Sequence, residues 1–377
     1  MTQLTNRREW LAASGLATLA ACSRNKGSGF NGYALVANAG DNSLAAVDLT
    51  AFRLAATLPL GSEPSRTLAS FQENQAFVLT PSDGTVHIVD SRLKVTTSRR
   101  LADFVAEIAL APDGKSLLAL APHSRELVQA DLATLRPTAR HKLSVTADSL
   151  DLSANGYAAV ASHSGDVELL HLVTGQRGRS RTPALGAIRF RADGKLLLAA
   201  NVQNRSLLAL DVPTLQVVAE LPLAMQPDNL CFNSDQGQLF VSGTGMDGVA
   251  VVFPYNTLEV DQTLLAGRSP GAMACSGTPP FLFVASTTAS DVCILNIDTR
   301  KVIGLVELGG RPSFIKVTPD NQYALVFDQT SGDMGVIHVP AIRESGDARR
   351  LRNGASLFTM LSVGSRPVDA VVIRRIA

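Results

Sequence analysis

The sequence predicts an all-β protein that forms a single β-propeller, and three observations lead to this prediction. A short apolar segment ending in a polar or turn residue recurs along the chain, as in LAAVDL (44–49), VHIVDS (86–91) and LLALDV (207–212). The fifth residues of the eight copies are spaced 40 to 43 residues apart: Asp48, Asp90, Asp131, His171, Asp211, Phe253, Asn296 and His338. No segment after residue 32 shows a sustained helical period with caps, so a repeat built only of strands is expected.

Each repeat contains four strand-like pieces. In residues 185–223 these pieces are LGAIRFRADGK, LLLAANVQNRS, LLALDVPTLQ and VVAELPLA. β-Branched and Leu-rich runs interrupted by Gly, Asp, Asn and Pro are typical of strands joined by hairpin turns. We name the four strands A, B, C and D in chain order, and one set makes one propeller blade.

Counting the pieces favours eight blades and a closed ring. The eight B–C–D sets begin near Tyr33, Ala76, Ser116, Tyr157, Leu196, Leu239, Phe281 and Tyr323. The first A strand lies near Thr67, and the last A strand is residues 367–376 at the C-terminus. The terminal A strand is therefore expected to join the first B–C–D set and remove an open sheet edge. Seven blades are the alternative, and this count requires that one of the eight C-strand segments is not a C strand.

The N-terminus has the pattern of an export signal. Arg7 and Arg8 precede a short apolar run that ends in Leu-Ala-Ala-Cys at Cys22, and the run is too short for a membrane-spanning helix. The arginine pair resembles a bacterial twin-arginine signal, and the run before Cys22 resembles a lipoprotein lipobox. The resemblance implies a signal peptide at 1–21, a lipidated Cys22 with a flexible tether over 22–32, and a propeller domain over 33–377. An ordinary secretory signal with a chance cysteine is the alternative.

Composition limits the classes of function. The chain has 377 residues, 46% of them hydrophobic and 18% charged, which excludes intrinsic disorder. The net charge is +1, and it becomes zero once residues 1–21 are removed, so no nucleic-acid partner is expected. Cys231, Cys275 and Cys293 lack metal-ligand spacing and are interpreted as small apolar strand residues. The sequence predicts no metal and no cofactor.

The repeat resembles a known family. The segments YALVANAGDNS (33–43), VIGLVELGGRPSFIKVTPDNQYALVF (302–327) and LSVGSRPVDAVVI (361–373) look like YVTN-type propeller repeats, and the likeness covers nearly all of the mature chain. This resemblance implies a propeller fold but little about function, because such repeats occur in binding proteins, surface proteins and a few enzymes. The family is mostly seven-bladed, and the eighth repeat resembles instead the haem domain of cytochrome-type nitrite reductases. No haem-domain motif is matched strongly enough to carry residues across.

Two groups of residues are candidates for a ligand site on one propeller face. The D-to-A loops carry four arginines that would form an arc at the mouth of the central channel: Arg66, Arg268, Arg311 and Arg366. Guanidinium groups suit carboxylate or phosphate ligands. The B-to-C loops of adjacent blades carry His123 and His163, which could bind a ligand on the same face. Ordinary loop residues paired with neighbours such as Glu63 are the alternative for the arginines, and polar turn residues are the alternative for the histidines.

The sequence therefore favours binding over catalysis, because it has a complete fold pattern and no complete catalytic motif. The leading hypothesis is an envelope-anchored, extracytoplasmic binding or scaffolding module in the bacterial periplasm or at the cell surface. Its expected partners are the membrane, through the lipid on Cys22, and an anionic small molecule or an envelope protein. A lactonase-like hydrolase of an acidic lactone is one alternative, and a cofactor-binding protein resembling the nitrite-reductase haem domain is a second.

Overall fold

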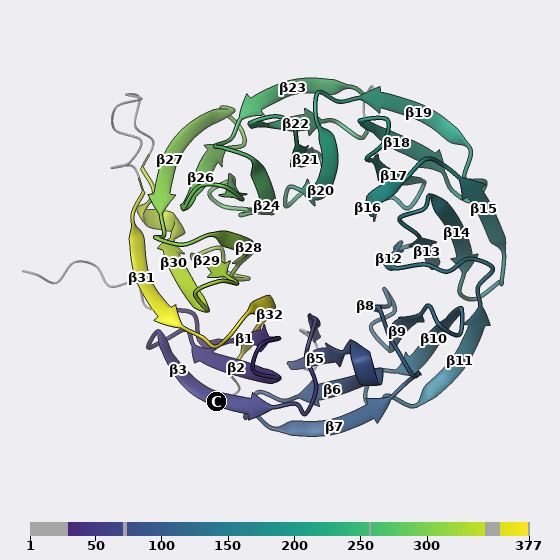
Figure 1. Cartoon of the computed structure of the whole chain (residues 1–377), viewed down its shortest axis with the longest axis horizontal. Coiled ribbons are helices and arrows are strands. Elements are labelled where there is room, and N and C mark those ends of the chain that lie inside the picture. Colours follow the sequence, from purple (N-terminus) through teal and green to yellow (C-terminus); the bar gives the residue numbers. More distant parts are fainter. Residues whose placement is uncertain (1–28, 71–73, 256–257, 344–354, 376–377) are drawn as a thin grey trace, which may run out of the picture.

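Eight four-stranded antiparallel sheets stand around a central opening in the computed structural model (Figure 1). The structure describes residues 29–70, 74–255, 258–343 and 355–375. The predicted signal peptide, including Arg7 and Arg8, and the predicted lipidation site Cys22 lie outside the described residues. The prediction of an eight-bladed, all-β propeller is confirmed, and the seven-bladed alternative is excluded.

Each blade runs outward from an inner strand that faces the central opening, and blade 1 takes its inner strand from the C-terminal end of the chain. The first four blades are β32 (Pro367–Arg374), β1 (Gly32–Asn38), β2 (Ser43–Asp48), β3 (Arg53–Pro59); β4 (Arg66–Ser70), β5 (Gln75–Thr80), β6 (Thr85–Val89), β7 (Val95–Arg100); β8 (Glu107–Leu110), β9 (Ser116–Ala121), β10 (Glu126–Asp131), β11 (Pro137–Lys142); and β12 (Ser149–Leu152), β13 (Tyr157–Ala161), β14 (Asp166–His171), β15 (Arg177–Arg181). The last four are β16 (Leu185–Phe190), β17 (Leu196–Asn201), β18 (Ser206–Asp211), β19 (Val217–Pro222); β20 (Gln226–Phe232), β21 (Leu239–Thr244), β22 (Gly248–Val252), β23 (Val260–Leu265); β24 (Pro270–Cys275), β25 (Phe281–Ser286), β26 (Asp291–Asn296), β27 (Lys301–Glu307); and β28 (Pro312–Val317), β29 (Tyr323–Asp328), β30 (Asp333–His338), β31 (Leu357–Ser362).

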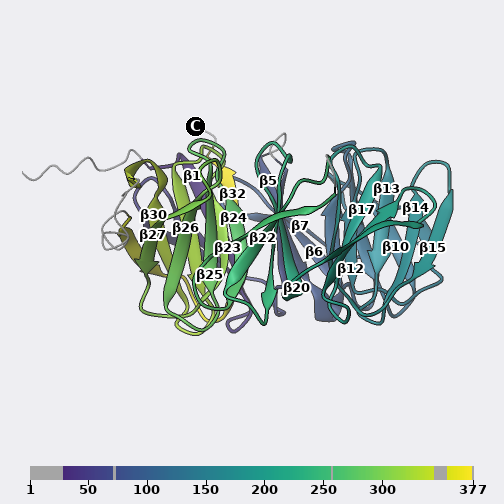
Figure 2. The same ribbon diagram turned by 90° about the horizontal axis from the view of Figure 1, so that it is seen from above.

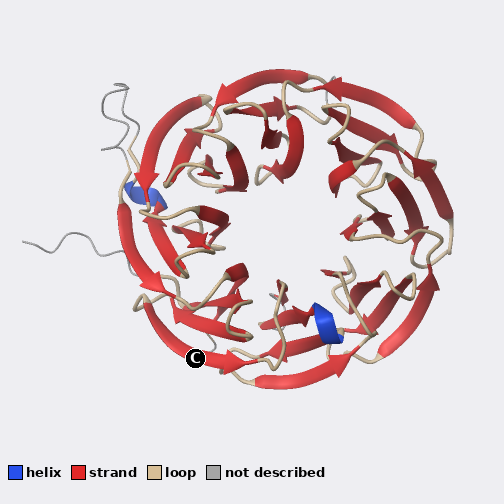
Figure 3. Ribbon diagram, viewed as in Figure 1, coloured by secondary structure: helices blue, strands red, loops and turns tan. Residues whose placement is uncertain are grey.

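The helical content of the described residues is two short 3-10 turns, η1 (Pro81–Asp83) and η2 (Val339–Ala341), drawn in blue in Figure 3. Among the described residues there is no helix long and apolar enough to cross a membrane. Seen from the edge, the blades stand side by side, and their connecting loops gather on two opposite faces (Figure 2). Loops 39–42 and 363–366 belong to the same face, since Gly40 N donates to Ser365 O at 3.0 Å.

The middle strands of each blade are apolar because both of their faces are covered by neighbouring blades. Every residue of β2, β9 and β17 is buried, whereas the outer strand β15 alternates between exposed and half-buried positions. The described residues form eight apolar clusters, one between each pair of neighbouring blades. The core is thus a ring of thin layers between blades.

The recurring Asp at the end of the C strand closes the turn that follows it. The Asp48 carboxylate accepts from Thr50 N at 2.9 Å, and the Asp131 carboxylate accepts from Thr134 N at 2.9 Å. In blade 4 the ring Nδ1 of His171 takes the same role and accepts from Val173 N at 3.2 Å. A short side chain that accepts from the backbone two or three residues ahead explains why this position repeats in sequence.

The C-terminal strand closes the ring as predicted. β32 pairs with β1 in an antiparallel register from Gly32 opposite Arg374 to Asn38 opposite Pro367. Arg375 follows β32 and reaches Asp48 at 2.9 Å and the Tyr33 hydroxyl at 2.8 Å. Phe30, placed by the sequence in the tether, is only 5% exposed and packs in the cluster between blades 8 and 1, so the packed domain begins before Tyr33.

We expect Val372→Asp to destabilise the fold by at least about 3 kcal/mol, because it buries a carboxylate in this cluster without a partner. Val372 is 5% exposed and packs between blades 8 and 1. Chemical unfolding monitored by circular dichroism measures the loss. Arg374→Asp is the matched control, because it places the same side chain at an exposed position of the same strand. Equal stabilities of the two variants would contradict the packing of β32 described above.

Candidate functional site

The wall of the central channel carries a group of charged side chains. The buried and half-buried ones come from six of the eight inner strands, one from each of blades 1, 2, 3, 4, 5 and 8, whereas the other two charged residues of the inner strands, Asp228 and Arg374, are exposed. We call this group the channel ring; its members are Asp369, Arg66, Glu107, Asp151, Arg189 and Lys316. With every group ionised, the ring holds three positive and three negative charges. Charges are tolerated here because five of the six residues remain partly exposed at the channel, and the buried Asp369 is paired.

Asp369 ties the closing strand to both neighbouring blades. Its Oδ1 lies 2.8 Å from Lys316 Nζ on β28. Its Oδ2 accepts from both Thr67 N at 2.9 Å and Thr67 Oγ1 at 3.1 Å on β4. Asp369 is 5% exposed, so its charge is held by this cation and these donors. The carboxylate therefore links blades 8, 1 and 2 at the channel.

Arg66 and Glu107 form a second link, between blades 2 and 3. Arg66 Nε lies 3.0 Å from Glu107 Oε1, but the two buried atoms are not aligned as a hydrogen bond, and both lack a hydrogen-bond partner. Burial raises the pKa of the Glu107 carboxyl above its usual range, and the Arg66 charge opposes that shift. The Arg66 side chain is 39% exposed, so its terminal N–H groups can donate to a ligand.

Asp151 and Arg189 lie on the neighbouring inner strands β12 and β16. Asp151 Oδ2 accepts from Phe190 N at 2.6 Å, and Arg189 NH1 donates to Ile188 O at 2.8 Å. Burial raises the pKa of Asp151, against the opposing effects of the Arg189 charge and the Phe190 N–H. The wall therefore contains two carboxyls that take up protons more readily than carboxyls in water do.

Two cavities open against this wall. A cavity of about 260 Å³ is lined by Arg66, Arg189, Lys316 and Asp369, and it brings together cations from blades 2, 5 and 8. A cavity of about 510 Å³ is lined by Asp151 and Arg189. The two cavities share Arg189, Leu230 and Cys231 as wall residues, so they lie next to each other. Three cations around one small cavity suit a compact anion.

The structure places one of the four arginines predicted to form an arc at the smaller cavity. Arg66 lies on β4 and lines the smaller cavity, whereas Arg268, Arg311 and Arg366 are exposed loop residues that do not line it. Arg366 forms an ion pair with Glu63, as the alternative interpretation expected. Arg311 contributes its backbone N–H to Asp328 Oδ2 at 2.7 Å. Only Arg66 of these candidates is therefore placed beside the other channel cations.

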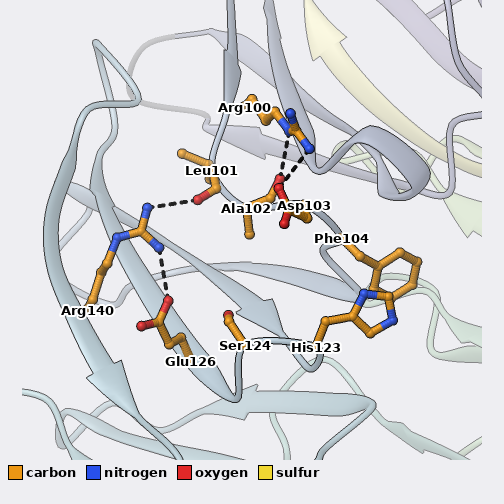
Figure 4. Close-up of a pocket in the computed structure, with 9 residues that line it drawn as sticks. All are labelled: Arg100, Leu101, Ala102, Asp103, Phe104, His123, Ser124, Glu126 and Arg140. Carbon is orange, nitrogen blue, oxygen red and sulfur yellow. Dashed lines mark hydrogen bonds and ion pairs between the residues drawn. The ribbon is translucent and has the colours of Figure 1, made fainter.

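The two candidate histidines lie in different settings. His123 stacks on Phe104 with ring centroids 4.8 Å apart, at the edge of a rim pocket of about 510 Å³ (Figure 4). The same pocket contains Arg100, whose guanidinium reaches Asp103 at 2.8 Å. His163 Nδ1 lies 2.6 Å from Asp148 Oδ2, and its side chain is 80% exposed. Each histidine therefore already has a local partner.

Five channel-ring residues were missed from the sequence: Glu107, Asp151, Arg189, Lys316 and Asp369. A usable signal was present, because each is a charged residue inside an otherwise apolar inner-strand segment, as in AIRF and FIKV. The described residues contain no group of three His, Cys, Asp or Glu side chains that could hold a metal ion.

Several solved structures are similar to this one, and three of them cover most of this chain. The structure is similar to dihydro-heme d1 dehydrogenase NirN in complex with DHE, with TM-score 0.73, 16% identity, and coverage of 94% of this chain and 78% of that chain. It is also similar to a functionally unknown protein from Desulfotomaculum acetoxidans, with TM-score 0.61, 10% identity, and coverage of 92% and 100%. A third is the Cps50 (Swd1) β-propeller domain of Myceliophteria thermophila, with TM-score 0.58, 13% identity, and coverage of 73% and 96%. No protein-family profile and no curated protein sequence matches the chain. At these identities the likeness establishes the fold that the chain shares with these propellers.

Proposed function

We propose that this protein is an extracytoplasmic, lipid-anchored binding module whose ligand is a small anion held in the central channel. The observation that carries the proposal is the cavity lined by Arg66, Arg189 and Lys316, which faces three cations from three separate blades. The proposal is confined to binding, because the contacts of the channel ring account for charge recognition and assign no atom to a chemical step.

Anion binding at this cavity is coupled to protons. The three carboxylates of the ring compete with any incoming anion for the same cations. Burial raises the pKa of Glu107 and of Asp151, so these two carboxyls become neutral as the pH falls, before ordinary carboxyls do. Their protonation leaves the ring with an excess of positive charge, and the anion should then bind more tightly.

Replacing Arg66 and Arg189 together with Gln should weaken sulfate binding to the full-length protein at least about tenfold, because each substitution removes a charge-assisted contact. Sulfate is a suitable probe because it keeps both charges between about pH 5.5 and about pH 8. Titration calorimetry should show tighter binding by the wild type at the lower pH, and weaker binding as salt rises.

Two matched variants control this experiment. Arg268→Gln with Arg311→Gln removes two exposed arginines outside the cavity and should leave sulfate affinity unchanged. Glu107→Gln with Asp151→Asn removes the two titrating carboxyls and should give tighter binding near pH 8 with little dependence on pH. Suppose that substitution of Arg268 and Arg311 weakened sulfate binding, whereas substitution of Arg66 and Arg189 did not. The ligand would then bind at the mouth of the channel.

The cellular location is a separate part of the proposal, and it rests on the N-terminal sequence. Arg7-Arg8 and the Leu-Ala-Ala-Cys segment support export and lipidation at Cys22. We expect Cys22→Ala to move the protein from the membrane fraction to the soluble extracytoplasmic fraction, as measured by fractionation after a salt wash. A variant that stays with the membrane would argue against a lipid anchor at Cys22.

A second candidate ligand is a carboxylated tetrapyrrole, favoured by the similarity to NirN, whose structure is a complex with DHE. The channel cations fit the carboxylates of such a ring. The inner strands, all of which the structure describes, carry no histidine, so they supply no imidazole for an iron atom. The residues present therefore fit the carboxylate edge of the ring through their positive charges, and toward its metal the cavity offers the sulfur atoms of Cys231 and Met273.

Titration of the full-length protein with metal-free protoporphyrin IX and with its iron complex tests this candidate. Visible absorbance should change with similar affinity for both compounds, because the expected contacts are to carboxylates, and sulfate should weaken both. Binding of the iron complex alone would contradict this mode and would favour an iron ligand, either Cys231 or Met273 at the cavity or His123 at the rim. Binding of neither compound would eliminate the candidate.

A further inference from the structure

Two cysteines from neighbouring blades meet at the channel wall. Cys231 lies on β20 of blade 6, and Cys275 lies on β24 of blade 7. Their Sγ atoms are 3.6 Å apart, although the residues are 44 positions apart in sequence. Both side chains are partly exposed, and Cys231 lines both channel cavities. A reagent in the channel can therefore reach the pair.

Several other seams between inner strands are bridged by polar side-chain contacts. Lys316 and Asp369 join blades 8 and 1, Arg66 and Glu107 join blades 2 and 3, and Asp151 joins blade 4 to blade 5. Between blades 6 and 7, the inner strands are in contact through the two thiols. This seam is joined farther out by Ser242 Oγ, which donates to Gly271 O at 2.6 Å.

We propose that Cys231 and Cys275 form a reversible disulfide that joins blades 6 and 7 at the channel wall. A disulfide fits better than a metal centre, because the described residues contain no group of three His, Cys, Asp or Glu side chains that could complete a coordination shell. Cys293 lies outside the pair: it is 1% exposed on β26, and burial raises its pKa to about 12.

The two thiols are suited to different steps of thiol–disulfide exchange. Contact with the Cys275 thiol lowers the pKa of Cys231, with burial opposing and the nearby Arg189 charge adding to the effect. Contact with Cys231 and burial raise the pKa of Cys275. Cys231 is also the member of the pair that lines both channel cavities, so we assign it as the thiolate that attacks and Cys275 as the thiol that resolves.

The oxidant is a low-molecular-weight disulfide. The Cys231 thiolate attacks one sulfur of that disulfide, forms a mixed disulfide and releases one thiolate, which takes up a proton. Cys275 then loses its proton to solvent and attacks Cys231 Sγ, which forms the bond between the two residues and releases the second thiol. Two protein thiols are oxidised and one external disulfide is reduced to two thiols.

Equilibration of reduced, full-length protein in glutathione redox buffers tests the proposal, followed by acid quenching, alkylation and peptide mass spectrometry. Trypsin separates the sites, because residues 206–268 contain only Cys231 and residues 269–300 contain Cys275 and Cys293. In the wild type and in Cys293→Ser, we expect these two peptides to become linked and to lose one alkylation each as the buffer becomes oxidising. The link should disappear in Cys231→Ser and in Cys275→Ser.

Three outcomes would overturn the proposal. All three thiols of the propeller could remain alkylated in the most oxidising buffer. A glutathione adduct could accumulate on Cys231 without transfer to Cys275. The link could persist in Cys293-containing protein but be lost in Cys293→Ser, which would assign the bond to Cys293. None of these results depends on sulfate binding, so the dithiol and the anion site are tested separately.

Discussion

Pairing between β32 and β1 is the interaction on which the rest of the structure depends. Each of the eight apolar clusters lies between two blades, so a blade buries both of its faces only if the ring is complete. The pairing joins residues near the two ends of the described chain, and Asp369 and Arg375 reinforce it with ionic contacts to Lys316 and Asp48. Closure also protects the inner edge of blade 1, which would otherwise present unpaired backbone groups.

Closure creates the channel, and the channel explains why charged residues stand on strands. In blade 2 the inner strand β4 is half-buried at most positions, whereas the adjacent β5 is buried at all but its first residue. A charge on an inner strand loses part of its hydration but not all of it. Glu107 and Asp151 show the cost of this loss, since burial raises the pKa of both carboxyls. Ion pairs and hydrogen bonds between neighbouring inner strands offset that cost. They also bring opposite charges together around the ligand cavity.

The repeat, the blade count and the closing strand could be predicted because they follow from the period and from turn chemistry that recurs in every blade. Except for Arg66, the residues of the channel ring were not predicted from the sequence. Which residues face the channel depends on where each inner strand begins, to within one residue. Arg66 lies two residues after Pro64 and falls on β4, whereas Arg268, Arg311 and Arg366 precede their prolines and stay on the loops. A one-residue shift changes which way a side chain points, and a period near 41 residues does not resolve it.

The two halves of the channel wall then respond to different chemistry. Protonation of Glu107 or Asp151 changes the net charge of the ring, so it changes the attraction for an anion. Formation of the proposed disulfide adds no charged group and would instead fix the seam between blades 6 and 7. Arg189 lies where the two halves meet: its charge acts on both Asp151 and Cys231, and it lines both cavities. Of the three channel cations, Arg189 is therefore the one that acts on both a titrating carboxyl and a thiol of the channel wall.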